Sequence, residues 1–306
     1  MSGLIRPPRL SPGDVVRVIA PSGPVPRAGF LAGAELLGRR YELRYDEGAL
    51  FASEGYLAGS DERRLAELLA ALTDPDARAV VMARGGYGLL RILPFLDPAV
   101  LRANPRPLVG FSDGTALLSY AARAGVAAVH GPVVTQLAGL PTADHAALFR
   151  LLENPAPGIV LEGLDEVVPG RARGRLVGGN LEVFSRLVGT PYLPELDGAI
   201  LFIEDLGERP YRVDRLITAL DLAGVFGALA GVVVGDFSAC VEPEPTRASS
   251  PPVAAVLVER LSRLTIPVVM GGLFGHGTRN LALPYGATCE LDTRHGALVA
   301  LEGAVS

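Results

Sequence analysis

A serine lies between two glycines in Gly110-Phe111-Ser112-Asp113-Gly114, which fits the pattern G-x-S-x-G. An apolar run precedes it, and Thr115 to Ala124 has the composition of a helix. On such a strand-to-helix turn the serine hydroxyl projects beyond the strand, and small glycines let the turn close. The N–H of Asp113 can then stabilise an oxyanion. We expect a nucleophile at Ser112, although helix capping by Ser112 or Asp113 would also explain the pattern.

A serine hydroxyl needs a base to take its proton, and histidine is the usual one. Of the four histidines, His145 falls in a polar helical stretch and His295 in a late turn, so we expect both at the surface. His130 directly follows an apolar run, and His276 lies between two glycines. Glycines on both sides favour presentation from a loop. The residues therefore favour His276 as the base and leave His130 as the alternative.

A third group, a carboxylate, should hold the imidazole in one tautomer. Glu204 and Asp205 end the apolar run at 199–205, and Glu208 begins the next expected helix. A carboxylate at the end of a strand is rigidly held, whereas one at a helix start can simply favour the helix dipole. We prefer Glu204, with Glu208 as the alternative.

A glycine-rich segment, Arg84-Gly85-Gly86-Tyr87-Gly88, follows another buried run. Glycines at a strand end let backbone N–H groups approach a ligand, either as oxyanion donors or as a phosphate cradle. The segment is no dinucleotide fingerprint, because Arg91 occupies the position of the last glycine. Gly178-Gly179-Asn180 is likewise no phosphate loop, because no Lys-Ser/Thr follows it.

The composition excludes several classes of function. The chain has 306 residues, 28 basic and 33 acidic, for a net charge of −5, and 49% of it is hydrophobic. An acidic globular chain of this kind does not attract nucleic acid. Cys240 and Cys289 lie far apart, so we expect two buried thiols and no metal site. Residues 1–14 lack an apolar signal region, and no run approaches ~20 apolar residues, so we expect a cytoplasmic protein outside the membrane.

The elements that must position these residues alternate in the first half of the chain. Ser60 with Asp61 and Glu62 makes a good helix start. Alternating strands and helices predict a parallel sheet with ligands beyond the carboxyl ends of its strands. The expected strands are 15–20, 41–45, 79–83 and 107–111, and the expected helices include 29–37 and one with Leu65, Leu68, Leu69 and Leu72 on its apolar face.

The second half has a different texture. A Pro-, Gly- and acid-rich stretch separates the halves and predicts a linker at 156–171, between domains at 1–155 and 172–306. We expect strands at 199–204, 231–235, 268–270 and 287–291, a helix near 181–187, one with Val213, Leu216, Ile217 and Leu220 on one face, and one opened by Ser250-Pro251.

Several of these segments, in this order, resemble the LD-carboxypeptidases, serine peptidases of family S66. The resemblance covers nearly the whole chain and rests on Ala20-Pro21-Ser22, 84–88 with 93–97, 110–113, His130-Gly131-Pro132, 178–181, 189–192, 201–208 and 275–277 with 283–286. It implies an α/β protein with an N-terminal flavodoxin-like domain, a C-terminal β-rich α/β domain, a homodimer and no metal or other cofactor.

Carried onto this chain, the resemblance implies a triad of Ser112, Glu204 and His276, with oxyanion N–H groups from Gly86 and Asp113. His130 then becomes a structural residue. Arg84 is a candidate for binding the substrate's terminal carboxylate, or it anchors the glycine loop.

The implied reaction is hydrolysis of the amide between an L-centre and the terminal D-alanine of murein tetrapeptide, a step of peptidoglycan recycling. Within the family, the alternative is cleavage of an aminoacyl-nucleotide antibiotic of the microcin C kind. Such relatives tend to stack an aromatic loop residue on the nucleobase, and this chain has no tryptophan, which disfavours that alternative. An inactive binding module is a weaker hypothesis. An ordinary α/β-hydrolase esterase is also weaker, because few strands precede Ser112 and the sequence has no HGGG-type segment.

Overall fold

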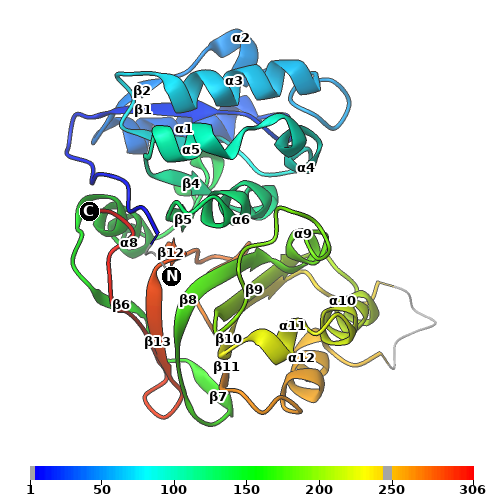
Figure 1. The fold of residues 1–306 in the computed structure, drawn as a ribbon. Helices are drawn as coiled ribbons and strands as arrows, with labels where there is room; N and C mark the ends of the chain where they lie inside the picture. Colours follow the sequence, from blue (N-terminus) through cyan, green and yellow to red (C-terminus); the bar gives the residue numbers. More distant parts are fainter. Residues whose placement is uncertain (1–3, 244–249) are drawn as a thin grey trace. The chain divides into compact units, whose positions relative to one another are not determined.

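The computed structural model describes residues 4–243 and 250–306, which form two compact units, each with its own sheet (Figure 1). Unit 1 comprises Met1–Ala156, Leu281–Gly286 and Gly303–Ser306, and unit 2 comprises Pro157–Asn280 and Ala287–Glu302. Within the described ranges, no helix combines the length and hydropathy of a membrane span. The two cysteines are buried and free, as expected.

The sheet of unit 1 has six strands in the order β12-β5-β4-β3-β1-β2. Five are parallel, and only β12 runs antiparallel, against β5. The parallel part has the flavodoxin-like order, which confirms the predicted fold. The strands are β1 (Val15–Ile19), β2 (Glu42–Arg44), β3 (Ala79–Met82), β4 (Leu108–Gly110), β5 (Ala128–His130) and β12 (Leu283–Tyr285).

Helices fill the connections between these strands. The helix predicted after Ser60 is α3, and the Ser60 hydroxyl accepts a hydrogen bond from the N–H of Arg63 at 3.3 Å. Of the four leucines predicted on its apolar face, Leu68 and Leu72 are buried, together with Arg64, and Leu65 and Leu69 are half-buried. The helices are α1 (Arg27–Gly38), α2 (Glu47–Leu50), α3 (Asp61–Thr73), α4 (Leu89–Ile92), α5 (Pro98–Ala103), α6 (Thr115–Arg123), α7 (Val134–Leu137) and α8 (Thr142–Glu153), with 3₁₀ turns at Leu93–Phe95 and Ser112–Gly114.

The core of unit 1 lies against its sheet. Val16 and Val18 of β1, Val81 of β3 and Phe30 of α1 are each at most 3% exposed. Burial of a side chain of this size stabilises the fold by ~1.5–3 kcal/mol. This packing makes the carboxyl ends of β1, β3 and β4 a rigid base for the loops that follow them.

The sheet of unit 2 has eight strands in the order β6-β14-β13-β8-β9-β10-β11-β7. The central β8, β9, β10 and β11 are parallel, and the outer strands are antiparallel to their neighbours. The strands are β6 (Gly158–Leu161), β7 (Asp165–Val168), β8 (Arg171–Asn180), β9 (Ile200–Leu206), β10 (Gly231–Ser238), β11 (Val268–Met270), β13 (Thr288–Asp292) and β14 (Ala297–Ala300).

The helices of unit 2 are α9 (Leu181–Ser185), α10 (Pro210–Leu222), α11 (Val225–Ala228) and α12 (Val253–Leu261). The predicted apolar face of α10 is buried at all four positions. The expected start of α12 at Ser250-Pro251 was wrong, because Pro252 is its N-cap. A residue before proline is pushed into extended backbone, so Pro251 cannot begin a helix.

Residues 156–171, expected as a linker, instead contain β6 and β7. β6 pairs with β14 and β7 with β11, so each forms an edge of the sheet. Edge strands are commonly short and interrupted by proline and charge. Their partners also lie more than ninety residues away along the chain. Local composition therefore resembled that of a linker.

Candidate active site

Ser112 occupies a tight turn at the carboxyl end of β4. Its backbone has φ 59°, and the only other described non-glycine residue with positive φ is Ala239. Such a conformation costs about 1–3 kcal/mol in a non-glycine residue and clusters at functional sites. A Cβ on Gly110 or Gly114 would lie 3.0 or 2.8 Å from the sulfur of Met82, so the turn needs both glycines. This is the strand-turn-helix context that the G-x-S-x-G pattern predicts.

The glycine-rich loop after β3 lies directly against Ser112. A Cβ added to Gly85 would be 2.7 Å from the Ser112 Cβ and 2.9 Å from its Oγ. Gly86 has φ 114°, a conformation that side chains rarely adopt. The exposed Arg84 donates a hydrogen bond from its guanidinium to the carbonyl of Pro24. The loop is therefore anchored through Arg84 and brings bare backbone next to the serine hydroxyl.

The side chain of Asp113 turns away from its own helix. Its Oδ2 accepts hydrogen bonds from the Ser22 hydroxyl at 2.6 Å and from the N–H of Leu89 at 3.0 Å. Burial raises the pKa of Asp113, and the Ser22 hydrogen bond is the largest opposing cause. The carboxylate thus binds the loop after β1 and the first residue of α4, rather than capping α6.

Arg64 is a residue of this region that the sequence reasoning missed. Its side chain is fully buried in unit 1 and hydrogen-bonded to backbone carbonyls and to Asp61. The available signal was its position four residues before Leu68, on the same face of α3. An arginine on the apolar face of a predicted helix marks a buried contact.

In unit 2, the predicted pair of Glu204 and His276 is in contact. The carboxylate Oε2 of Glu204 lies 2.7 Å from Nδ1 of His276. Glu204 is 0% exposed near the end of β9, where it cannot turn freely. A Cβ on Gly275, which has φ 139°, would lie 3.4 Å from the Glu204 Cβ. This glycine thus lets the loop that carries His276 pass close to the strand.

The other acidic candidate, Glu208, forms an ion pair with Arg212 at 3.6 Å, one helical turn away. Nδ1 of His276 instead contacts the carboxylate of Glu204, at 2.7 Å. Between the two carboxylates weighed from the sequence, the geometry favours Glu204.

The surroundings of Glu204 are strongly polar for a buried site. Burial raises the pKa of Glu204, and the hydrogen bond from His276 opposes this shift. Burial likewise raises the pKa of the adjacent Asp205 to about 6. Asp205 accepts hydrogen bonds from Asn180 Nδ2 at 2.9 Å and from the N–H of Glu182 at 3.1 Å. Asn180 also supports the ionised form of Glu204 through a hydrogen bond.

The remaining histidines occupy different surroundings. His130 is 0% exposed on β5, with its ring 5.3 Å from that of Phe111 in an edge-to-face contact. His145 is half-buried, with Nε2 2.7 Å from the carbonyl of Leu137, and the exposed His295 contacts Asp292 at 2.8 Å. His295 is at the surface as expected, and His145 is less exposed than expected.

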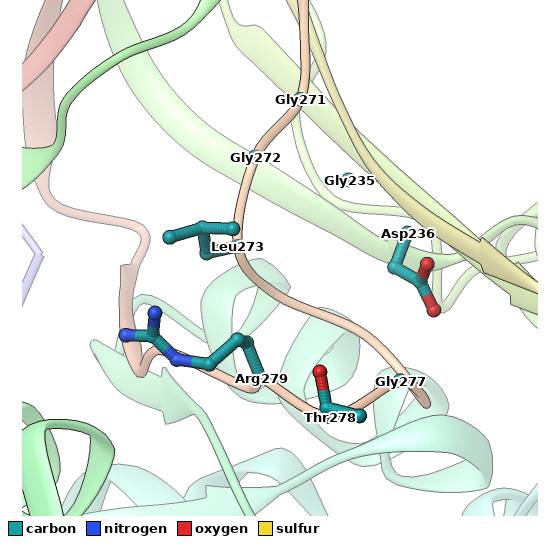
Figure 2. Close-up of a pocket in the computed structure, with 8 residues that line it drawn as sticks. All are labelled: Gly235, Asp236, Gly271, Gly272, Leu273, Gly277, Thr278 and Arg279. Atoms are coloured by element: carbon teal, nitrogen blue, oxygen red, sulfur yellow. The ribbon is translucent and has the colours of Figure 1, made fainter. Parts of the chain in front are cut away.

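A pocket of about 250 Å³ adjoins the His276 loop within unit 2. The register between β9 and β10 shifts between Val234 and Phe237, and Asp236 lies in this irregularity. The N–H of Asp236 donates to the carbonyl of Phe274 at 2.9 Å. Figure 2 shows Asp236 and Arg279 on opposite sides of the pocket, with the glycine-rich segment 271–277 running between them. β10 therefore helps to hold the loop that presents His276.

Comparison with known proteins decides the family. The sequence profile of the LD-carboxypeptidase N-terminal domain matches residues 16–131, and that of the C-terminal domain matches residues 173–291. The chain is also 36% identical to the murein tetrapeptide carboxypeptidase of Pseudomonas aeruginosa, over 84% of this chain and 83% of that protein. The chain belongs to the LD-carboxypeptidase family. As a member of this family it is a carboxypeptidase, a hydrolase of peptides.

Two further relatives of this LD-carboxypeptidase are informative. The muramoyltetrapeptide carboxypeptidase of Oxalobacter formigenes, a solved structure, is 30% identical, with a TM-score of 0.81 over 93% of this chain and 97% of that one. The microcin C7 self-immunity protein MccF of Escherichia coli is 28% identical over 92% of each chain. The family resemblance and the fold predicted from the sequence are thus confirmed.

Proposed function

We propose that this protein is a serine carboxypeptidase that cleaves the L–D amide bond of murein tetrapeptide and releases the terminal D-alanine. The observation that carries the proposal is the 2.7 Å contact between Glu204 and His276. A carboxylate on Nδ1 leaves Nε2 as the basic nitrogen, which is the arrangement that activates a serine. The relatives named for murein and muramoyl tetrapeptides support this choice of substrate.

In the proposed mechanism, His276 takes the proton of the Ser112 hydroxyl as the oxygen attacks the scissile carbonyl. Glu204 stabilises the imidazolium that forms. The N–H groups of Gly86 and Asp113 stabilise the oxyanion. Collapse of the tetrahedral intermediate breaks the amide, His276 protonates the departing amine, and water activated by His276 hydrolyses the acyl-enzyme.

A carboxypeptidase must also hold the substrate's terminal carboxylate. Arg84 is our candidate, because its guanidinium is exposed and its hydrogen bond to Pro24 leaves further N–H donors on the same planar group. Inversion of the last centre would turn the carboxylate away from such a cation. We therefore expect the all-L isomer of the tetrapeptide to be a poor substrate.

The proposal also includes the setting in which the enzyme works. We propose a cytoplasmic homodimer that acts on a small peptide in peptidoglycan recycling, without a metal or other cofactor and without a nucleic-acid or membrane partner. The family resemblance supports the dimer. The net charge of −5 supports the exclusion of nucleic acid.

The second candidate is hydrolysis of an aminoacyl-nucleotide antibiotic. The 28% identity to the microcin immunity protein favours it, whereas the higher identity of 36% to a murein enzyme favours the first candidate. The same triad would serve both reactions, so the recognition of the leaving group separates them.

One experiment tests both candidates. The protein is incubated with murein tetrapeptide, with its all-L isomer and with an aspartyl-adenylate sulfamoyl analogue, and the products are followed by mass spectrometry. We expect release of D-alanine from the first alone. Cleavage of only the nucleotide analogue would move the enzyme to the immunity branch. Cleavage of none, with no labelling of Ser112 by a fluorophosphonate, would indicate an inactive binding module.

A further inference from the structure

A buried arginine connects separate loops of unit 1. Arg64 of α3 is 0% exposed. Its Nε donates to the carbonyl of Gly59 at 3.3 Å, and its Nη1 donates to those of Pro21 at 2.6 Å and Gly88 at 2.9 Å. Its Nη2 pairs with Asp61. Desolvating a guanidinium is costly unless its donors are satisfied, and here they are satisfied mainly by loop backbone.

Asp113 connects the same loops from the other side. It is 3% exposed, and the donors from Ser22 and Leu89 converge on one oxygen, Oδ2. Ser22 follows Pro21 in the loop after β1, and Leu89 follows Gly88 in the loop after β3. Each loop is therefore held twice, once through a carbonyl by Arg64 and once through a donor by Asp113.

Both connections act on the backbone around Gly86. The N–H of Gly23 donates to the carbonyl of Gly85 at 3.1 Å, so the loop after β1 supports the glycine loop. A Cβ on Gly86 would lie 2.9 Å from the Cα of Gly23. The chain is thus fixed before Gly86 by Gly23, and after it by Arg64 and Asp113. Rotation of the Gly86 peptide would have to break one of these contacts.

We propose that Arg64 and the carboxylate of Asp113 are positioning residues, which hold the Gly85–Gly86 backbone in the orientation that stabilises the oxyanion during attack by Ser112. This inference rests on the proposed catalytic role of Ser112. Preorganised N–H donors stabilise developing charge without reorganising during the reaction. Neither side chain needs to touch the substrate.

The test compares Arg64→Lys and Asp113→Ala with the wild type, using murein tetrapeptide. We expect kcat to fall about 10- to 100-fold while KM changes less than about threefold. The reason is that the oxyanion, which these N–H donors stabilise, forms only in the transition state. The rate of Ser112 labelling by a fluorophosphonate should fall in parallel, since its oxygen needs the same donors. Asp113→Asn should restore kcat to within about fivefold of the wild type, because one amide oxygen can accept both hydrogen bonds that converge on Oδ2.

Arg106→Lys is the matched control. Arg106 is a partly buried arginine of the same unit whose Nη1 donates to the carbonyls of Ala71 at 3.1 Å and Asp74 at 2.8 Å. It precedes β4, so it lies at the end of the sheet opposite Ser112. This variant should lose thermal stability and keep kcat within about twofold.

The outcomes separate this inference from the proposed function. Wild-type kcat in folded Arg64→Lys and Asp113→Ala, or an equal loss in Arg106→Lys, would overturn the positioning role. If either variant does not fold, Ser22→Ala replaces it, and we expect this substitution to lower kcat three- to tenfold. An unchanged kcat in Ser22→Ala would overturn the inference. Retained turnover in Ser112→Ala would instead refute the proposed mechanism itself.

Discussion

Replacement of Glu204 by glutamine removes one negative charge from the environment of His276 and changes little else. The side chain keeps its size, and the amide oxygen can still accept a hydrogen bond from Nδ1. What is lost is the attraction between a buried carboxylate and the imidazolium that forms as Ser112 gives up its proton. With 2.7 Å between the nearest atoms, the centres of charge are ~4 Å apart. At an effective dielectric constant of ~20 this attraction is ~4 kcal/mol.

Since each 1.36 kcal/mol is a factor of ten in rate, Glu204→Gln should lower kcat by about 10³-fold. Glu208→Gln is the matched control. Glu208 pairs with Arg212, whose side chain is 52% exposed, so this substitution should change kcat by less than about threefold. KM should change little in either variant. The loss in Glu204→Gln concerns the transition state.

The assay measures release of D-alanine from murein tetrapeptide. The thermal stability of each variant is measured separately by calorimetry. Burial raises the pKa of Glu204, so its ionised form costs stability at neutral pH, and the Glu204→Gln variant should unfold at the same temperature as the wild type or higher. A larger loss of kcat in Glu208→Gln would refute the reasoning and move the triad acid four residues along the chain, to Glu208. A loss below tenfold in Glu204→Gln would also refute it.

Four other results are expected. Ser112→Ala should lower kcat ~10⁴-fold or more, and adding His276→Ala should hardly lower it further, because triad losses are not additive; near-normal turnover would remove the nucleophile. Activity should survive EDTA, whereas a loss on chelation that zinc restores would indicate a metalloenzyme. Gly85→Ala, whose new Cβ would meet the Ser112 Oγ at 2.9 Å, should abolish fluorophosphonate labelling without unfolding, while Gly139→Ala, with 3.6 Å to its nearest neighbour, should not. Folding raises the pKa of Asp205 from 3.8 to about 6. Its contribution to the free energy of unfolding is therefore fully present below about pH 4 and is lost as the pH rises through about 6. The unfolding free energy of wild type minus that of Asp205→Asn should fall by ~3 kcal/mol over that range, and a flat difference in urea titrations would contradict the shift.

The first half of the fold could be predicted because each helix or strand has its own local sequence signal. The helix after Ser60 has a cap, acidic residues in its first turn and an apolar face, and the strand at β3 is a continuous apolar run. The edge strand β2 was still predicted, but the edge strands β6, β7 and β12 could not be predicted in this way. β6 and β12 depend on partners far away in the chain, β14 and β5 respectively.

The proposed catalytic residues could be named from the sequence because their neighbours are glycines or strand ends. Ser112 and His276 are flanked in this way, and Glu204 lies near the end of a strand. Arg64 could have been noticed as an arginine on the apolar face of α3, but its role could not be predicted, because its partners are mainly backbone carbonyls, which leave no pattern in the side chains. For the same reason the direction of the Asp113 carboxylate appears only in three dimensions.

The discontinuity of unit 1 has a consequence for biosynthesis. β5 ends at His130, but its neighbour β12 begins at Leu283, after almost all of unit 2 has been made. At ~5–20 residues per second, a nascent chain waits about 8–30 s between the two strands. During that interval β5 is an open edge, the kind of surface on which unfinished chains aggregate. The sheet of unit 1 is therefore the first to begin and stays incomplete until most of unit 2 has been made, so heat shock during translation should damage this intermediate more than the finished protein.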